Sequence, residues 1–111
     1  MNKRVKKRIN IGLDAAFGSS CMALTENISE GGIYVKIACT ETAANIRPGA
    51  MVNLALELPS GKLLTLKCKK VWSNKNTSNS LIEHIGVEII NPPDEYKFFY
   101  HRLRLQNFKW Q

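Results

Sequence analysis

The chain has 111 residues, of which 44% are hydrophobic, and its formal net charge is +7. A chain of this size and composition forms one small folded domain, and it contains no run near the roughly 20 apolar residues that cross a bilayer. Its three cysteines are odd in number and far apart, which excludes a disulfide framework and any regular metal-binding spacing. We therefore expect no membrane insertion, no metal and no cofactor.

The beginning of the chain resembles a signal peptide only superficially. A basic segment precedes the apolar residues 9–17, but Asn10, Gly12 and Asp14 interrupt them. A short and interrupted apolar run is a poor secretion signal. The sequence therefore predicts a cytoplasmic protein.

The positive charge is concentrated at one end of the chain. Residues 1–8 hold five of the sixteen basic residues and no acid, so that residues 9–111 carry eleven bases against nine acids. Such asymmetry indicates a local anion-binding site or a nucleic-acid-binding arm. We divide the chain into a flexible basic segment, residues 1–8, and one folded domain, residues 9–111.

Alternating apolar and polar residues predict three strands in the first part of the chain, over residues 9–17, 21–28 and 33–37. In the second of these strands, Met22, Leu24 and Ile28 share one face, which we expect to be buried. Asn27 lies on the opposite face. The pattern therefore predicts that Asn27 points away from the core.

The middle of the chain predicts a β-hairpin with an irregular second strand. The turn Pro59-Ser60-Gly61 separates two alternating runs, 52–58 and 64–68. The pair Lys69-Lys70 then breaks the alternation, which predicts a β-bulge. We expect this bulge to leave one of Val71 and Trp72 inside and the other outside.

The last part of the chain predicts a strand followed by a helix. Residues 85–89 alternate, Asn91-Pro92-Pro93 ends the strand, and helical spacing covers about residues 94–106. Six short strands with tight turns and one helix indicate a mainly all-β protein. We predict a six-stranded antiparallel β-barrel with a C-terminal α-helix packed on it.

Two arginines in the basic segment, Arg4 and Arg8, form an Arg-x-x-x-Arg pattern. A terminal charge run is often only a solvated tail. A guanidinium, however, can donate two parallel hydrogen bonds to phosphate or to the O6 and N7 edge of guanine. Two arginines in one flexible segment could therefore grip both halves of a symmetric guanine dinucleotide.

A second polar pattern, Asn27-x-Ser29-x-x-Gly32, lies between two predicted strands. These residue types are common turn formers, and a turn needs no ligand to explain them. In the functional interpretation, Asn27 and Ser29 project outward to bind a ligand. Gly31 and Gly32 then allow a close approach of the backbone to that ligand.

The two patterns, in this order and on a small barrel, resemble the PilZ domain family. The resemblance covers nearly the whole chain and includes the Val71-Trp72 strand end, the Gly86–Ile89 strand and the terminal helix. It implies a bacterial receptor or adaptor for the second messenger cyclic di-GMP. It also implies a downstream protein partner in motility, pilus or polysaccharide machinery.

The resemblance assigns the ligand-binding residues one by one. Arg4 and Arg8 match the arginines that contact guanine and phosphate. The motif on the barrel supplies the other contacts, from Asn27, Ser29 and Gly32. Further candidate contacts are Lys3, Gly31, Lys36 and Trp72, with Lys3 standing where many members have another arginine.

Other function classes find less support in the sequence. No catalytic motif, paired-carboxylate signature or phosphate loop is present, so we expect no enzyme. A small barrel that binds nucleic acid through a basic arm is the alternative. Outward strand positions offer few aromatic residues for base stacking, with Tyr34 and Trp72 the candidates, so no DNA or RNA partner is expected.

Overall fold

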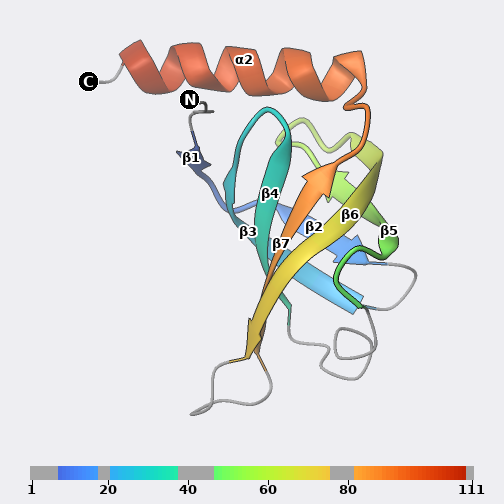
Figure 1. Cartoon of the computed structure of the whole chain (residues 1–111). Helices are drawn as coiled ribbons and strands as arrows, with labels where there is room; N and C mark the ends of the chain where they lie inside the picture. Colours follow the sequence, from blue (N-terminus) through green and yellow to red (C-terminus); the bar gives the residue numbers. More distant parts are fainter. Residues whose placement is uncertain (1–7, 18–20, 38–46, 76–81, 110–111) are drawn as a thin grey trace, which may run out of the picture.

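The structure is a computed structural model and describes residues 8–17, 21–37, 47–75 and 82–109. It consists of a strand barrel with one helix lying across its end (Figure 1). The strands are β1 (Ile9–Asn10), β2 (Asp14–Phe17), β3 (Cys21–Ile28), β4 (Gly32–Ile37), β5 (Met51–Glu57), β6 (Leu63–Lys75) and β7 (Glu83–Ile89), and the helix is α2 (Asp94–Lys109).

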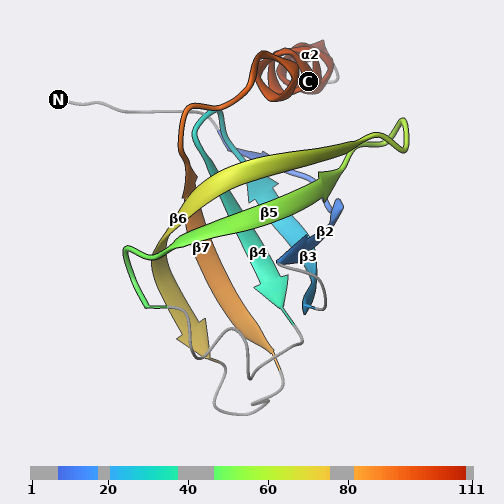
Figure 2. The ribbon, with the colours of Figure 1, turned by 90° about the vertical axis from the view of Figure 1, so that its right-hand side faces the viewer.

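The barrel is closed because β3 pairs along both of its edges. The strands follow the order β1-β3-β2-β5-β6-β7-β4, and β3 also pairs with β4, so that β2 to β7 form a complete antiparallel ring. The turned view of Figure 2 shows β5 and β6 crossing in front of β4 and β7. A closed ring leaves no unpaired strand edge. The predicted six-stranded antiparallel barrel with a C-terminal helix is confirmed.

The first predicted strand is divided into β1 and β2, and both parts pair with β3. At the division, the Thr25 hydroxyl accepts a hydrogen bond from the Leu13 amide at 2.7 Å and donates one to the Ile11 carbonyl at 2.6 Å. This buried side chain replaces the backbone pairing that the interruption removes. The interruption therefore leaves these backbone groups satisfied.

A register shift between Thr25 and Asn27 makes β3 a bulged strand. The expectation that Met22 and Leu24 are buried is wrong, because their side chains are 66% and 42% exposed. The alternate residues of the strand face the core instead, and the extra residue in the bulge then returns Ile28 to the inside. Asn27, next to the bulge, is half-buried and hydrogen-bonded to an exposed side chain.

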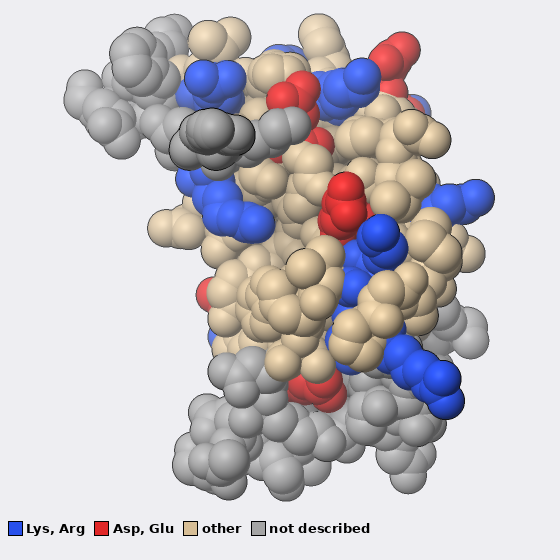
Figure 3. Space-filling model, in the orientation of Figure 1, with Lys and Arg blue, Asp and Glu red and all other residues tan. Residues whose placement is uncertain are grey.

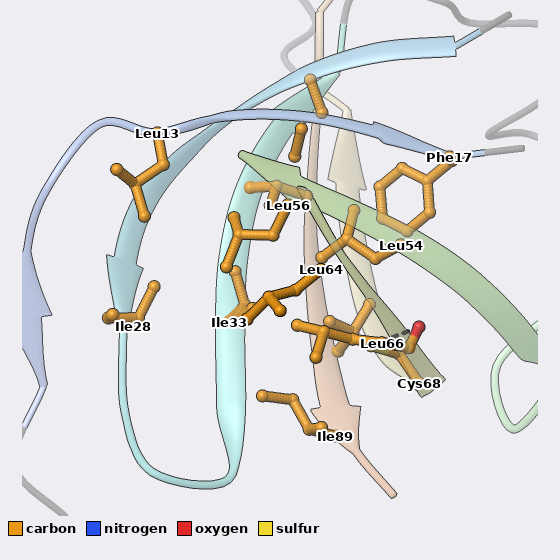
Figure 4. Packing of buried hydrophobic residues seen from close by; sticks show 14 of the residues in the cluster. Leu13, Phe17, Ile28, Ile33, Leu54, Leu56, Leu64, Leu66, Cys68 and Ile89 are labelled. Atoms are coloured by element: carbon orange, nitrogen blue, oxygen red, sulfur yellow. Dashed lines mark hydrogen bonds between the residues drawn. The ribbon is translucent and has the colours of Figure 1, made fainter. Parts of the chain in front are cut away.

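The interior of the barrel is filled by apolar side chains from every strand of the ring, and most of them are branched aliphatic. Figure 4 shows Ile28, Ile33, Leu54 and Leu66 directed toward a common centre. Burial also raises the pKa of the Cys68 thiol to about 12, so this cysteine behaves as a small apolar residue. The alternation of β4, β5 and β6 predicted these inward positions correctly.

The second hairpin strand contains the predicted bulge, between Lys70 and Trp72. Its effect differs from the prediction that one of Val71 and Trp72 is inside. Val71 is 53% exposed and Trp72 is 40% exposed, whereas Lys70 is buried. The bulge therefore places two consecutive apolar side chains on the outside of the barrel.

Helix α2 is held on the barrel by two tyrosines. Tyr96 and Tyr100 are buried, and Phe99 and Leu103 pack partly against the core beside them. The helix begins after Pro93, whose carbonyl accepts a hydrogen bond from the Lys97 amide at 3.0 Å. It extends three residues beyond the predicted end, to Lys109. Among the described residues, no helix has the length and apolar character that a membrane span requires.

The Tyr96 hydroxyl gives a test of how the helix is attached. It donates a 2.5 Å hydrogen bond to the Ser29 carbonyl, and both groups are buried. We predict that Tyr96→Phe lowers the free energy of unfolding by about 1–3 kcal/mol, because a buried carbonyl loses its donor. Urea denaturation of both proteins measures this difference. Tyr34→Phe is the control, because water can replace the half-buried Tyr34 hydroxyl and the loss should be smaller.

Wild type and Tyr96→Phe should also differ in how their free energy of unfolding depends on pH. Burial, together with nearby Tyr100, raises the pKa of Tyr96 above its ordinary value of 10.0. A group whose pKa is higher in the folded state than in the unfolded state stabilises the fold at pH values below the unfolded pKa. This stabilisation is lost as the pH rises toward the folded pKa. The difference between wild type and Tyr96→Phe should therefore be constant below about pH 9 and shrink above about pH 10. A difference that grows in alkali would contradict this attachment.

Candidate functional site

A hollow of the described surface lies at the end of the barrel that carries α2. Its volume is about 690 Å³, and it is bordered by residues 29–32, strands β6 and β7, and the beginning of the helix. Arg8, Ser29, Gly31, Gly32 and Trp72 all contribute to its wall. Residues that the sequence placed in two separate motifs therefore meet at one cavity.

Arg8 reaches the cavity because β1 pairs with the end of β3. Ile9 lies opposite Ile28, so the preceding arginine is held next to the turn that follows β3. Its Nη1 donates a 2.7 Å hydrogen bond to Asn27 Oδ1 on the exposed surface. Its Nη2 is 3.8 Å from the position that a Cβ atom would occupy at Gly32. The structure thus brings the second arginine of the basic segment together with Asn27 and Gly32.

Ser29 stabilises the turn from inside. The expectation that it projects outward is wrong, because it is buried. Its amide donates a 2.8 Å hydrogen bond to the Gly32 carbonyl, and its hydroxyl donates to the same oxygen at 3.3 Å. Its own carbonyl accepts from Tyr96 of the helix. The serine therefore fixes the shape of the turn while still lining the cavity.

The two glycines of the turn differ in how closely their surroundings pack. A Cβ at Gly32 would lie 3.2 Å from the Val87 carbonyl oxygen, a contact tighter than side chains normally make. At Gly31, a Cβ would meet no atom within 4 Å, and its carbonyl accepts a 2.8 Å hydrogen bond from the Ile89 amide. Packing thus explains the glycine at position 32, and the space outside Gly31 stays open toward the cavity.

Trp72 forms a flat wall on one side of the cavity. It lies opposite Gly86 on β7, and a Cβ at Gly86 would be 2.3 Å from the indole Nε1. The Tyr34 ring packs edge-on against the indole, with centroids 5.0 Å apart and an interplanar angle of 74°. The tryptophan is therefore positioned on both sides by its neighbours, and it remains 40% exposed.

One of the predicted contacts, Lys36, is not part of this arrangement. Lys36 pairs with Glu26 at 3.0 Å on the outer face of the barrel and does not line the cavity. Arg4 and Lys3 lie outside the described residues. Their roles remain predictions from the sequence.

Several residues of the cavity wall were not predicted from the sequence. Glu30, Glu88 and Lys97 bring charge to it, and Gly86 brings space. Glu30 occupies an unassigned position of the turn motif, and its Oε2 lies 3.2 Å from His101 Nε2 on the helix. The signal for Gly86 was present, since a glycine inside a strand often marks a close approach of another group.

The cavity wall carries charges of both signs. Arg8 and Lys97 are basic, whereas Glu30 and Glu88 are acidic. On the face shown in Figure 3, basic and acidic side chains are likewise interspersed, and no single charge covers the barrel. The attraction of an anionic ligand would therefore depend on the individual cations next to it, and not on a net positive charge of the whole surface. No group of three or more metal-binding side chains occurs among the residues that the structure describes.

Comparison with known proteins gives a match over most of the chain. The sequence of residues 1–105 matches the PilZ domain family. The chain belongs to this family. No curated protein sequence matches the chain.

The PilZ fold is also recognised from solved structures. The chain is similar to the Bacillus subtilis inhibitor of motility, MotI/DgrA, with a TM-score of 0.74 and 18% sequence identity. The similarity covers 96% of this chain and 53% of that one, so the PilZ domain described here spans about half the length of its structural neighbour. At this identity, the comparison establishes the fold.

The contact between Trp72 and Gly86 gives a test of the cavity wall in this PilZ domain. We predict that Gly86→Ala displaces the indole and lowers stability by about 1–3 kcal/mol, as overpacking does in other proteins. Thermal unfolding measures the loss. Gly31→Ala is the matched control, because a Cβ there meets no atom within 4 Å. The double variant provides the check. If Gly86→Ala lowers stability as much in the Trp72→Ala background as in wild type, the contact with the indole is not the cause of the loss.

Proposed function

We propose that this PilZ domain is a cyclic di-GMP receptor whose ligand binds in the cavity beside Arg8. The observation that carries the proposal is the hydrogen bond between Arg8 and Asn27, at 2.7 Å on the rim of the cavity. It joins the two motifs that are separated by nineteen positions in the sequence. A guanidinium, an open glycine backbone and a flat indole line one space, and the Asn27 amide is bonded to that guanidinium.

Each of these groups suits one part of a guanine dinucleotide. Arg8 has five N–H donors, so it can keep its bond to Asn27 and still donate to a phosphate or a guanine edge. The Asn27 amide offers both a donor and an acceptor to a base. Trp72 offers an exposed ring face for stacking, which contributes about 1–3 kcal/mol per base. Lys97 adds a second cation to the cavity wall.

In this proposal, Arg4 and the basic segment around it close over the bound nucleotide. Ordering about five residues costs roughly 5–10 kcal/mol of backbone entropy. Four or five charge-assisted hydrogen bonds return roughly 6–15 kcal/mol, and stacking adds to them. The balance corresponds to an affinity near the micromolar range, on the order of −8 kcal/mol.

The proposed output is a surface formed by the ordered segment beside helix α2. The turn that lines the cavity is attached to this helix by Tyr96 and faces His101 through Glu30. In Figure 1, the chain enters the barrel at the end where α2 lies. A segment that becomes fixed there would change the surface next to the helix, and a downstream protein could read that change. The domain would thus act as an adaptor.

Substitution of Arg8 tests the proposal directly. We predict that Arg8→Ala weakens cyclic di-GMP binding more than tenfold, or by more than about 1.4 kcal/mol. The melting temperature without ligand should change little, because the bond to Asn27 is exposed. Calorimetric titration measures the affinity. Arg47→Ala, an exposed arginine outside the cavity wall, is the control, and equal affinities of Arg8→Ala and wild type would refute the assignment.

A nucleic-acid-binding barrel is the second candidate, because residues 1–8 contain five basic residues and no acid. The described surface gives it less support, since Tyr34 packs edge-on against Trp72 and only the indole lines the cavity. Non-specific binding to single strands would show a steep loss of affinity with salt.

A salt titration with a labelled single-stranded oligonucleotide separates the two candidates. For a cyclic di-GMP receptor, we predict weak binding that disappears near physiological salt, and no effect of the oligonucleotide on the nucleotide titration. Tight oligonucleotide binding that cyclic di-GMP does not displace would favour the nucleic-acid function.

A further inference from the structure

A second cavity lies between helix α2 and the turn that joins β5 to β6, and it shares no lining residue with the Arg8 site. Its volume is about 320 Å³, at the lower end of the range for ligand clefts. One wall is the turn between β5 and β6, and the other is the middle of the helix. Its walls are mainly apolar, with contributions from Leu58, Pro59, Phe98, Phe99 and Leu103.

A large apolar side chain at the rim of this groove is exposed to solvent. Phe98 is 66% exposed although it lines the groove, and Leu105, which lies near it along the helix, is 67% exposed. Residues at positions i, i+4 and i+7 share one face of a helix, so Arg102 stands between these two. Its guanidinium carbon lies 5.9 Å from the centre of the Phe98 ring. Phe98 and Arg102 therefore belong to the groove wall, and Leu105 follows on the same face of the helix.

Arg102 is the charged residue among those that line the groove. After Glu95, no acidic residue follows in the helix, whereas Lys97, Arg102 and Arg104 are basic. Glu95 itself pairs with Lys62. Among the residues that the structure describes, no carboxylate pairs with Arg102. An occupant that brings its own carboxylate would therefore meet an available cation next to an apolar surface.

We propose that this groove, together with Phe98, Arg102 and Leu105, docks an acidic amphipathic helix of a partner protein. Large apolar side chains of that helix fill the groove, and an Asp or Glu next to them pairs with Arg102. Helices commonly bind in grooves through apolar anchors at helical spacing, and aromatic and arginine residues often dominate such interfaces. This site is separate from the proposed nucleotide site.

Two other occupants fit the surface less well. A second copy of the chain would place its basic helix against this one, and an antiparallel pair would bring arginines of like charge together. A membrane is flat, whereas the apolar floor of the groove lies between the helix and the β5–β6 turn. Charge and shape therefore favour an acidic protein segment.

The proposal can be tested by selecting peptides from a displayed random library. The peptides are roughly 15 residues long, so that a short helix can form. The full chain is the bait, and Phe98→Ser is used for counter-selection. We expect the selected peptides to combine Asp or Glu with Leu, Phe or Trp at helical spacing. Their affinity should fall at least tenfold in Phe98→Ser and in Arg102→Glu, and Arg102→Glu should instead select peptides with Lys or Arg.

Met22→Ser is the matched control, because Met22 has the same exposed fraction as Phe98, 66%, and lies on the barrel strand β3. It should leave peptide binding unchanged. All three variants should bind cyclic di-GMP as wild type does. A loss of peptide binding can therefore be distinguished from a loss of nucleotide binding.

Three results would overturn the proposal. One is the absence of peptides that distinguish wild type from Phe98→Ser. Another is self-association in sedimentation experiments that Phe98→Ser abolishes, which would make the surface a dimer interface. The third is binding to phosphatidylserine-containing vesicles that depends on Phe98 and is stronger than binding to the selected peptides.

Discussion

The double pairing of β3 is the constraint on which the rest of the structure depends. This strand pairs with β1 and β2 on one edge and with β4 on the other, which closes the barrel. Its bulge changes the direction of the side chains before the strand ends. Ile28 therefore enters the core while Asn27 meets Arg8. One irregularity thus completes the core and positions the rim of the proposed binding site.

The turn after β3 connects this site to the helix through the backbone. The Ser29 carbonyl accepts the Tyr96 hydroxyl, and the Gly31 carbonyl accepts the Ile89 amide just before the chain leaves the barrel. Hydrogen bonds between buried groups resist distortion, because an unsatisfied partner would be costly. A ligand that moved this turn would therefore have to move α2 or break these bonds. The same contacts that support the site make the helix sensitive to it.

The sequence predicted the architecture because the strands of a barrel have one buried and one exposed face. Regular alternation identified the inward residues of β4, β5 and β6. It failed where backbone irregularities shift the alternation, at Met22 and Leu24 and at the Val71–Trp72 pair. A bulge is a property of two paired strands, so a single strand sequence does not reveal which residue is the extra one.

Much of the candidate site was also predictable, for a different reason. Arg8, Asn27 and Gly32 belong to short motifs whose chemistry is visible without a structure. The buried role of Ser29 and the charges of Glu30 and Lys97 were not visible, because they depend on where α2 packs. Contacts between distant elements require the fold itself.

The close packing of Trp72 on Gly86 has a consequence for sequence variation. The indole occupies the space in which any other residue at position 86 would carry its Cβ. A flat aromatic ring at one position and a side chain at the other exclude each other. Related chains should therefore vary these two positions together, since residues in direct contact tend to change as pairs. A relative that lacks the tryptophan would be free to replace the glycine, and its cavity would then lose the flat indole wall.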